Sequence, residues 1–298
     1  PCGRGLGIAL WRALKDGRAR MAAVDEDGKA ALLDAEDFMP IVYGARENGV
    51  STVAHVRRLM ERGEALANGI EGLRLLVPLT APEVWAAGVT YQRSREARNY
   101  EATGGRMDAT TFYDKVYDAE RPELFFKSTA ARTVGPGEPV CLRSDSNWQV
   151  PEPELGLVLD RDGSIVGFTI GNDMSSRDIE GENPLYLPQA KIWRNSCAIG
   201  PCVVPAEAIG DPYALELRLI IRRGGETAVD ERASTSQLKR RLEELVSFLK
   251  RDNVLFDGTV LLTGTCIVPP NDFTLAAGDV IEIGIGGIGT LVNPVEAA

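Results

Sequence analysis

Short apolar segments separated by glycine and proline dominate the chain from about residue 77 to its end. The segments read PVCLRSD, LGLVLD, SIVGFTIGND, ALELRLIIRRGG, TVLLTGT and DVIEIGIGGIGTLVNPV. Runs of this length and composition are typical of β-strands. Only two helical patterns interrupt them, SREARNYEATGG and STSQLKRRLEELVSFLKRD. In the second pattern we expect a Ser/Thr cap at the start and an apolar face made of Leu238, Leu242, Leu245, Val246 and Leu249. Many strands with few helices predict an α+β, mainly β fold, a mixed barrel or roll in which antiparallel pairs predominate.

The first 76 residues have a different pattern. Asp-Gly turns at Asp16-Gly17 and Asp27-Gly28 separate short strand-like segments. The stretch VSTVAHVRRLMERG then has helical spacing, with Ser51 or Thr52 able to cap its start and Gly63 or Gly69 able to end it. We therefore expect a small N-terminal α/β domain over residues 1–76 and a larger catalytic domain over residues 77–298.

The charge balance excludes several classes of partner. The chain has 33 basic and 43 acidic residues and a formal net charge of −10. Nucleic-acid binding and docking on an anionic membrane both need a basic face, so we expect neither. We expect no transmembrane helix, because no apolar run reaches 18 residues, and no signal peptide. The five cysteines are an odd number without CxxC spacing. They predict free thiols in a reducing cytoplasm.

A single histidine, His55, limits the chemistry. A Ser-His-Asp triad, a Cys-His pair or a multi-histidine metal site would all have to use it. His55 lies in the predicted helix but off its apolar stripe, so we expect an ordinary surface position.

Acidic residues are grouped around the stretch PEPELGLVLD. Glu152 and Glu154 are two residues apart, so in a strand they point to the same face. Asp173 ends the next apolar segment and returns beside them if the two segments form a hairpin around Asp162-Gly163. Three carboxylates this close need a cation between them. Oxygen-only ligands favour Mg²⁺, with Mn²⁺ or Ca²⁺ able to take its place.

An alternative interpretation of the two glutamates is a solvated strand face. Two observations favour an enclosed site instead. The segment is apolar on both faces from Leu155 onward, which is typical of buried strands. The prolines at 151 and 153 confine the segment to an edge or bulge, where side chains are often directed into sites.

Two more ionisable residues lie in apolar surroundings. Lys191, between Ala190 and Ile192, is a candidate base, because a partly desolvated lysine has a lowered pKa; the alternative is a surface lysine. Glu123 in AERPELFFKST is a candidate acid, and the alternative is an ion pair with Lys127 at helical spacing. The polar stretch over residues 93–118 is either a lid over the site or a surface excursion.

An ordered set of motifs resembles the fumarylacetoacetate hydrolase superfamily. The motifs are VPEPELGLVLD, GFTIGNDMSSRD, NSCAIGPCVV, LLTGTCIVPP and GIGTLVNPV, and the match spans about residues 82–296. The resemblance implies a fumarylacetoacetate hydrolase-like mixed β-roll behind a small N-terminal domain. It also implies a homo-oligomer, a dimer or a tetramer.

Within the superfamily, RPELFFKST, SDSNWQVPEPEL, IEGENPLYLPQAKIW and IRRGGE most resemble enzymes that remove water from 3-deoxy-2-keto sugar acids. The resemblance implies that 2-keto-3-deoxy-D-arabinonate is converted to 2,5-dioxopentanoate in non-phosphorylative pentose degradation. It makes Glu152, Glu154 and Asp173 the Mg²⁺ ligands and places Lys191 and Glu123 at the substrate. Thr290 of the GIGT turn becomes a contact for the substrate carboxylate. We expect Lys191 to be the base, with a pKa that burial lowers and the nearby carboxylates pull back upward, and Glu123 to be the acid. Sequence leaves open whether the two roles are exchanged.

Other reactions on the same scaffold are the nearest alternatives. They are hydrolysis of a carbon–carbon bond in a 2,4-diketo-3-deoxy sugar acid, and decarboxylation or isomerisation of a keto acid. The hydrolases of the superfamily use a His-Glu pair on a lid. Residues 93–118 contain no HxxE motif, and the only histidine lies far upstream. Elimination is therefore favoured. A non-catalytic module that binds Ca²⁺ or a sugar acid is a more distant alternative.

Overall fold

Antiparallel strands open the N-terminal part of the chain, as the computed structural model shows; it describes residues 7–103 and 112–297. Strands β1 (Ala9–Lys15) and β2 (Arg18–Val24) pair around Asp16 and Gly17. Both turn residues have positive φ, 49° and 77°, as the tight hairpin turn that fits the twist of its strands requires. The second predicted turn also forms, since Gly28 N donates to Asp25 O before β3 (Ala30–Leu32).

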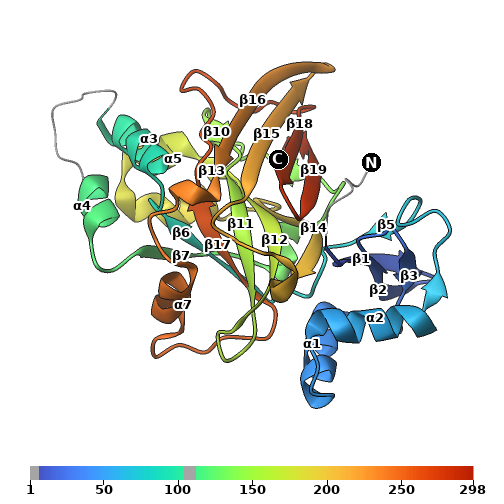
Figure 1. The fold of residues 1–298 in the computed structure, drawn as a ribbon. Helices are drawn as coiled ribbons and strands as arrows, with labels where there is room; N and C mark the ends of the chain where they lie inside the picture. Colours follow the sequence, from blue (N-terminus) through green and yellow to red (C-terminus); the bar gives the residue numbers. More distant parts are fainter. Residues whose placement is uncertain (1–6, 104–111, 298) are drawn as a thin grey trace.

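Two helices cover one side of these strands (Figure 1). They are α1 (Phe38–Glu47) and α2 (Thr52–Arg62). The predicted cap of α2 is confirmed, because Ser51 accepts a hydrogen bond from Ala54 N and the helix ends at Gly63. His55 is half-buried on α2 beside Gly44 of α1, an ordinary helix-packing position. Short strands β4 (Glu64–Ala65) and β5 (Arg74–Leu75) complete this part.

A 12-stranded sheet runs through the whole molecule. Its main path is β4-β3-β2-β1-β14-β12-β11-β17-β6-β7, with β5 beside β1 and β8 beside β14. The strands not yet described are β6 (Glu83–Gly88), β7 (Glu123–Thr129), β8 (Thr133–Val134), β11 (Pro153–Leu159), β12 (Ile165–Asp173), β14 (Cys197–Pro205) and β17 (Thr259–Thr265). The central strands β14, β12, β11 and β17 pair antiparallel in succession. They are wholly or almost wholly buried, as the apolar sequence segments predict.

A second sheet packs against the first. Its order is β16-β15-β18-β19-β9, and its strands are β16 (Glu226–Ser234), β15 (Glu216–Arg223), β18 (Val280–Ile285), β19 (Gly289–Glu296) and β9 (Val140–Cys141). Leucines of β11 share one apolar core with leucines and isoleucines of β15 and β18. The mainly β, mixed architecture of the prediction is therefore confirmed.

The other helices lie at the edges of the sheets. They are α3 (Gln92–Thr103), α4 (Phe112–Asp118), α5 (Arg177–Glu182), α6 (Leu187–Lys191) and α7 (Leu242–Lys250). Helix α3 packs on α5 (Figure 1). The predicted stretch over 93–118 thus forms α3 and α4 where the structure describes it; residues 104–111 lie outside the described part.

The start of α7 differs from the prediction. A Ser/Thr cap was expected, but Ser234 instead caps a short 3-10 turn, Thr235–Gln237. The helix itself begins after Arg241, whose N–H donates to the Glu244 side chain. The predicted apolar face is buried from Leu242 onward.

The expected domain boundary falls between β5 and β6. Two features join the parts on either side of it. Strand β1 pairs with β14 at Leu10 and Val203, and one apolar core contains residues from both parts, among them Met21 and Val260. The division at residues 76 and 77 stays a prediction.

The described cysteines carry no disulfide. Cys141, Cys197, Cys202 and Cys266 are buried and free, and Cys2 lies outside the described residues. No helix in residues 7–103 and 112–297 is long and apolar enough to cross a membrane.

Replacement of Leu157 tests how far the fold depends on β11. Leu157 is fully buried, so Leu157→Ala should lower the free energy of unfolding by about 2–5 kcal/mol, because it removes buried methyl groups and leaves a cavity. Leu185, which is 84% exposed, is the matched control, and Leu185→Ala should change the same quantity little. Urea unfolding of both variants measures the difference.

Candidate active site

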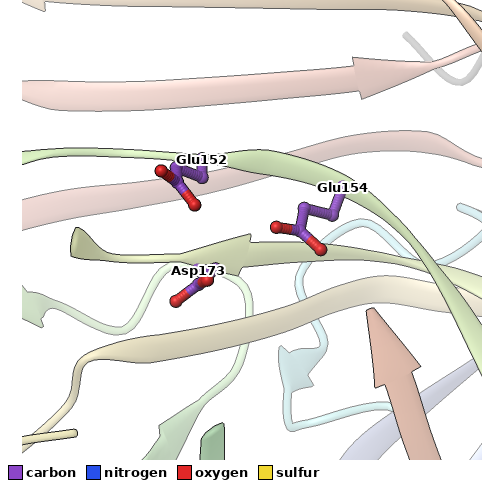
Figure 2. Close-up of side chains that lie close together, drawn as sticks. All are labelled: Glu152, Glu154 and Asp173. Atoms are coloured by element: carbon purple, nitrogen blue, oxygen red, sulfur yellow. The ribbon is translucent and has the colours of Figure 1, made fainter. Parts of the chain in front are cut away.

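The hairpin of β11 and β12 brings three carboxylates together. Pro153 pairs with Asn172, and Asp173 N donates to Glu152 O at 3.0 Å. Glu152, Glu154 and Asp173 each place a carboxylate oxygen within 4.8 Å of the others. Figure 2 shows the three groups turned toward the same space. All three residues are buried, so the convergence that the sequence predicts is present.

The turn and the flanking strands fix this hairpin. Asp160 Oδ1 accepts hydrogen bonds from Asp162 N and Ser164 N, and Gly163 takes a φ of 77°. Beyond the site, the chain pairs again as β10 (Gln149–Val150) with β13 (Ser175–Ser176). Glu152 and Asp173 therefore lie between two paired segments, which hold their backbones in register.

Glu154 is held by a backbone donor. Its Oε2 accepts from Gly264 N at 2.7 Å. Gly264 has a φ of 97° and lies on β17, where the pairing with β11 is irregular between Glu154 and Gly156. Burial raises the pKa of Glu154 well above its ordinary range, and the charges of Asp173 and Glu152 add to the effect. Ionised Glu154 therefore needs a nearby positive charge.

Lys191 lies at the end of α6 and reaches into the trio. Its Nζ donates to Glu152 Oε2 at 2.7 Å, Asp173 Oδ2 at 3.0 Å and Ser175 Oγ at 2.5 Å. Lys191 is wholly buried, so the surface alternative is wrong. Burial alone would lower the pKa of Lys191, but Asp173 and Glu152 raise it above its ordinary value. The expected lowered pKa is therefore not found in this arrangement, because two carboxylates hold the proton.

A second lysine, Lys127, also contacts one carboxylate of the trio. It lies on β7 with no exposed surface, and its Nζ is 2.6 Å from Asp173 Oδ1. The alternative of an ion pair between Lys127 and Glu123 is wrong, because the segment is a strand and Lys127 binds Asp173. Burial raises the pKa of Asp173, but Lys127 and Lys191 together hold it below its ordinary value. The signal in the sequence was a lone cation in the apolar segment LFFKST.

Helices α3 and α5 add four charged residues that the sequence did not single out. Arg98 and Glu101 of α3 meet Glu180 and Arg177 of α5 as two ion pairs, Arg98 with Glu180 at 2.5 Å and Arg177 with Glu101. Arg177 also reaches Glu152 Oε1 at 3.2 Å. Burial lowers the pKa of Arg177 to about 10. The polar sequences of these helices predict exposure to solvent. Their charged side chains are buried only because the two helices pack on each other.

Glu123 begins β7, opposite Gly88 of β6. A methyl group on Gly88 would overlap its carboxylate, so glycine is needed there. Glu123 Oε2 is buried and has no hydrogen-bond partner among the described residues. Burial raises the pKa of Glu123; Arg98 opposes this and Glu180 adds to it. Glu123 is thus a carboxyl group with a raised proton affinity, and it lies beside Gly88, which lines the same small cavity as Lys191.

The described part of the site carries an excess of negative charge. Its buried acidic side chains are those of Glu101, Glu123, Glu152, Glu154, Asp173 and Glu180. Its buried basic side chains are those of Arg98, Lys127, Arg177 and Lys191. When all are ionised, two negative charges are left, which is the charge of one divalent cation. The oxygen-only donor set fits a hard ion such as Mg²⁺, so the residues present fit the ion that the sequence predicts.

Thr290 lies outside the cavity at the carboxylate trio. It is exposed on β19 in the second sheet, and it is not among the described residues that line the cavity at the trio. Its contact with a substrate carboxylate stays a prediction. His55 is on α2 in the N-terminal part.

Comparison with known proteins identifies the family. The model of the fumarylacetoacetate (FAA) hydrolase C-terminal domain matches residues 94–296. The chain belongs to the fumarylacetoacetate hydrolase family. A probable 2-keto-3-deoxyxylonate dehydratase of Haloferax volcanii is 51% identical over 80% of this chain and 80% of its own length. A 2-dehydro-3-deoxy-D-arabinonate dehydratase of Saccharolobus solfataricus is 48% identical over 97% of this chain and 96% of its own length.

Solved structures of the fumarylacetoacetate hydrolase family agree with the fold. One is a 2-keto-3-deoxy-D-arabinonate dehydratase complexed with magnesium and 2,5-dioxopentanoate. It has a TM-score of 0.83 and 38% identity, and the match covers 97% of this chain and 99% of that chain. A fumarylacetoacetate hydrolase from Exiguobacterium antarcticum has a TM-score of 0.72 and 23% identity, over 98% of this chain and all of that chain, and shows the likeness of fold alone.

Added Mg²⁺ should stabilise the protein through the trio. A ligand that binds only the folded state stabilises it by about 2.7 kcal/mol at a hundred times its Kd, and a thermal shift measures this. Glu154→Gln or Asp173→Asn should abolish most of the shift, because two carboxylates hold Mg²⁺ poorly.

The matched control for these variants is Asp160→Asn. Asp160 is also a buried carboxylate of the β11–β12 hairpin, but it pairs with Arg46 at 2.7 Å, at the other end of the hairpin. The variant should lose stability yet keep the wild-type response to Mg²⁺. An undiminished Mg²⁺ shift in Glu154→Gln and Asp173→Asn would show that the ion binds elsewhere.

Proposed function

We propose that the protein is a Mg²⁺-dependent hydro-lyase that converts 2-keto-3-deoxy-D-arabinonate to 2,5-dioxopentanoate and water in the breakdown of pentose sugar acids. The observation that carries the proposal is the buried trio of Glu152, Glu154 and Asp173, with Lys191 Nζ 2.7 and 3.0 Å from two of its members. The two relatives at 48% and 51% identity are dehydratases of closely related sugar acids, by their names.

Glu152, Glu154 and Asp173 would hold the ion. Mg²⁺ supplies Lewis-acid chemistry when bound, because it draws electron density from the 2-keto group of the substrate and acidifies the neighbouring C3 position. Lys127 and Arg177 each bind one oxygen of a ligand, Lys127 on Asp173 and Arg177 on Glu152. They orient the two carboxylates from outside the trio. Helices α3 and α5 close over the site with buried ion pairs and keep bulk water out.

Lys191 and Glu123 move the protons. In our assignment Lys191 takes a proton from C3 and Glu123 gives one to the departing C4 hydroxyl, so the C4–O bond breaks and water leaves. A double bond between C3 and C4 remains. Transfer of a proton from C5 to C3 then gives an enol with its double bond between C4 and C5. Movement of the enol O–H proton to C4 turns this enol into the aldehyde product. The raised pKa of Glu123 suits a group that holds a proton at neutral pH; exchange of the two roles is the alternative.

The charge balance supports a protonated Glu123 in the state in which Lys191 still carries its proton, and Lys191 has to lose that proton before it can act as the base. If Glu123 is protonated, the other nine charged residues of the site leave one negative charge. The anionic substrate adds a second, so substrate and a divalent cation together give a neutral, enclosed site. Burial of an uncompensated charge costs several kcal/mol, so neutrality favours binding of the ion and the keto acid together.

We also propose that the chain works as a cytoplasmic homo-oligomer, a dimer or a tetramer, and that Thr290 contacts the substrate carboxylate. The resemblance to the family supports the oligomer and the contact of Thr290, and the buried free thiols support the reducing compartment. Light scattering after size-exclusion chromatography gives the subunit count.

A substrate panel tests the function. It contains 3-deoxy-2-keto pentonates and hexonates, each with Mg²⁺ or Mn²⁺, and mass spectrometry identifies the products. Dehydration releases water and leaves a single five-carbon aldehyde from the pentonate. Two carbon fragments would instead mean hydrolysis of a carbon–carbon bond, and carbon dioxide would mean decarboxylation.

Replacement of Lys191 should stop the reaction. Removal of a general acid or base typically costs about 10²–10⁴-fold in rate, so we expect a loss of that size in the kcat of Lys191→Met at saturating Mg²⁺. Near wild-type kcat in the folded variant would remove Lys191 from the proton transfers.

Gly88 allows a gentler test of Glu123. Gly88→Ala should displace the Glu123 carboxylate while leaving the fold intact, because the obstacle is the end of a side chain. Misplacement of a reacting group by about 1 Å can cost about 10²-fold in rate, and we expect a loss of that order in kcat. The control is Gly210→Ala, since Gly210 has ordinary φ and open space around it. Equal kcat values for the two variants would contradict the role of Glu123.

A further inference from the structure

Lys127 makes more contacts than an ion pair requires. Besides Asp173 Oδ1 at 2.6 Å, its ammonium group donates to Met174 O at 2.8 Å and to the backbone oxygen of Lys191. The contact with Asp173 is an ion pair, whereas the two backbone oxygens accept hydrogen bonds from the ammonium group. The ammonium group also lies 5.4 Å from the centre of the Trp193 ring. One fully buried side chain on β7 therefore contacts two other segments: the end of β12 with the residue that follows it, and the end of α6.

Two of the residues that Lys127 contacts, Asp173 and Lys191, also contact each other. Lys127 binds the side chain of Asp173 and the backbone of Lys191, while Lys191 Nζ itself donates to Asp173 Oδ2 at 3.0 Å. Lys127 thus occupies Oδ1 and leaves Oδ2 facing the trio and Lys191. The same ammonium group therefore fixes the orientation of the Asp173 carboxylate and the position of the Lys191 backbone, from which the Lys191 side chain extends.

We propose that Lys127 is a positioning residue for the metal site and for Lys191, an inference that rests on the proposed function. Its ammonium group sets the orientation of the Asp173 carboxylate toward the ion and keeps Lys191 in register with it. Lys127 touches neither substrate nor ion. Its effect passes through Asp173 and Lys191, as partners of metal ligands commonly act on the ligands they orient.

Simple charge compensation makes the opposite prediction. If Lys127 only neutralised Asp173, its removal would take a positive charge away from the trio and tighten Mg²⁺ binding, because like charges repel. If Lys127 positions Asp173, its removal frees the carboxylate to rotate and weakens Mg²⁺ binding. The direction of the change in Mg²⁺ affinity therefore separates the two roles.

The experiment compares Lys127→Met with the wild type. Isothermal titration calorimetry with Mg²⁺ alone, without substrate, gives the Kd, and steady-state kinetics at saturating Mg²⁺ give kcat and KM. We expect a Kd about 10–100-fold weaker, as for other partners of metal ligands, and a fall in kcat larger than the change in KM. Unchanged or tighter Mg²⁺ binding in the folded variant overturns the proposal.

Arg46→Met is the matched control. It also leaves a buried aspartate unpaired, Asp160 at the other end of the same hairpin, so it should lower thermal stability. Its Kd for Mg²⁺ and its kcat should stay within about twofold of the wild type, since neither residue contacts the trio or Lys191. A weaker Kd in Arg46→Met of the size expected for Lys127→Met would mean that general destabilisation is the cause, and the positioning role would fall.

Lys127→Arg decides the case if Lys127→Met fails to fold. Arginine keeps the positive charge, but its planar guanidinium group does not match the positions of Asp173 Oδ1 and the two backbone oxygens around the lysine ammonium group. We expect a folded variant whose kcat falls at least about tenfold; a smaller loss overturns the proposal. The Mg²⁺ titration needs no substrate, so it judges Lys127 even if the wild type fails to dehydrate the sugar acid, which would contradict only the proposed function.

Discussion

The burial of opposite charges at one end of the β11–β12 hairpin is the constraint on which the site depends. Isolated carboxylates cannot be buried in ionised form without a large cost in free energy. Here each oxygen of Asp173 meets a lysine, and Glu152 is held between Lys191 and Arg177. These cations do not cancel the acids completely, and the remaining negative charge favours the binding of a hard cation.

Local patterns predicted the parts of the structure that local physics determines. The Asp-Gly turns, the Ser51 cap and the buried central strands follow from conformational preference and strand composition alone. The hairpin around Asp162 and Gly163 was predictable for the same reason, and it determined the convergence of Glu152, Glu154 and Asp173 because strand register fixes which residues face each other. The three acids could therefore be placed together without knowledge of the rest of the fold.

Contacts between distant segments were not predictable in this way. Lys127 was read with helical spacing, whereas β7 is a strand held by its neighbour β6, so its partner is Asp173 from another hairpin. Arg98 and Glu101 lie on a polar helix that looks solvated in isolation, and only the packing of α3 on α5 buries their charges. The pKa of Lys191 was expected to be lowered by burial and pulled back upward by nearby carboxylates, but its contacts with Glu152 and Asp173 raise the pKa above its ordinary value. Each difference comes from tertiary contacts that a single segment does not encode.

The pairing of β1 with β14 gives the N-terminal residues a protective task. Strand β14 adjoins β12, the strand that ends in Asp173, and β14 also pairs with β1 at Val203 and with β8 at Cys197 and Ala198. A shortened chain that lacked β1 would leave the backbone donors and acceptors of an apolar strand open to other molecules, and exposed edges of this kind recruit further strands and aggregate. The N-terminal strands therefore cover part of the edge of an apolar strand beside the site, at a distance from the carboxylate trio.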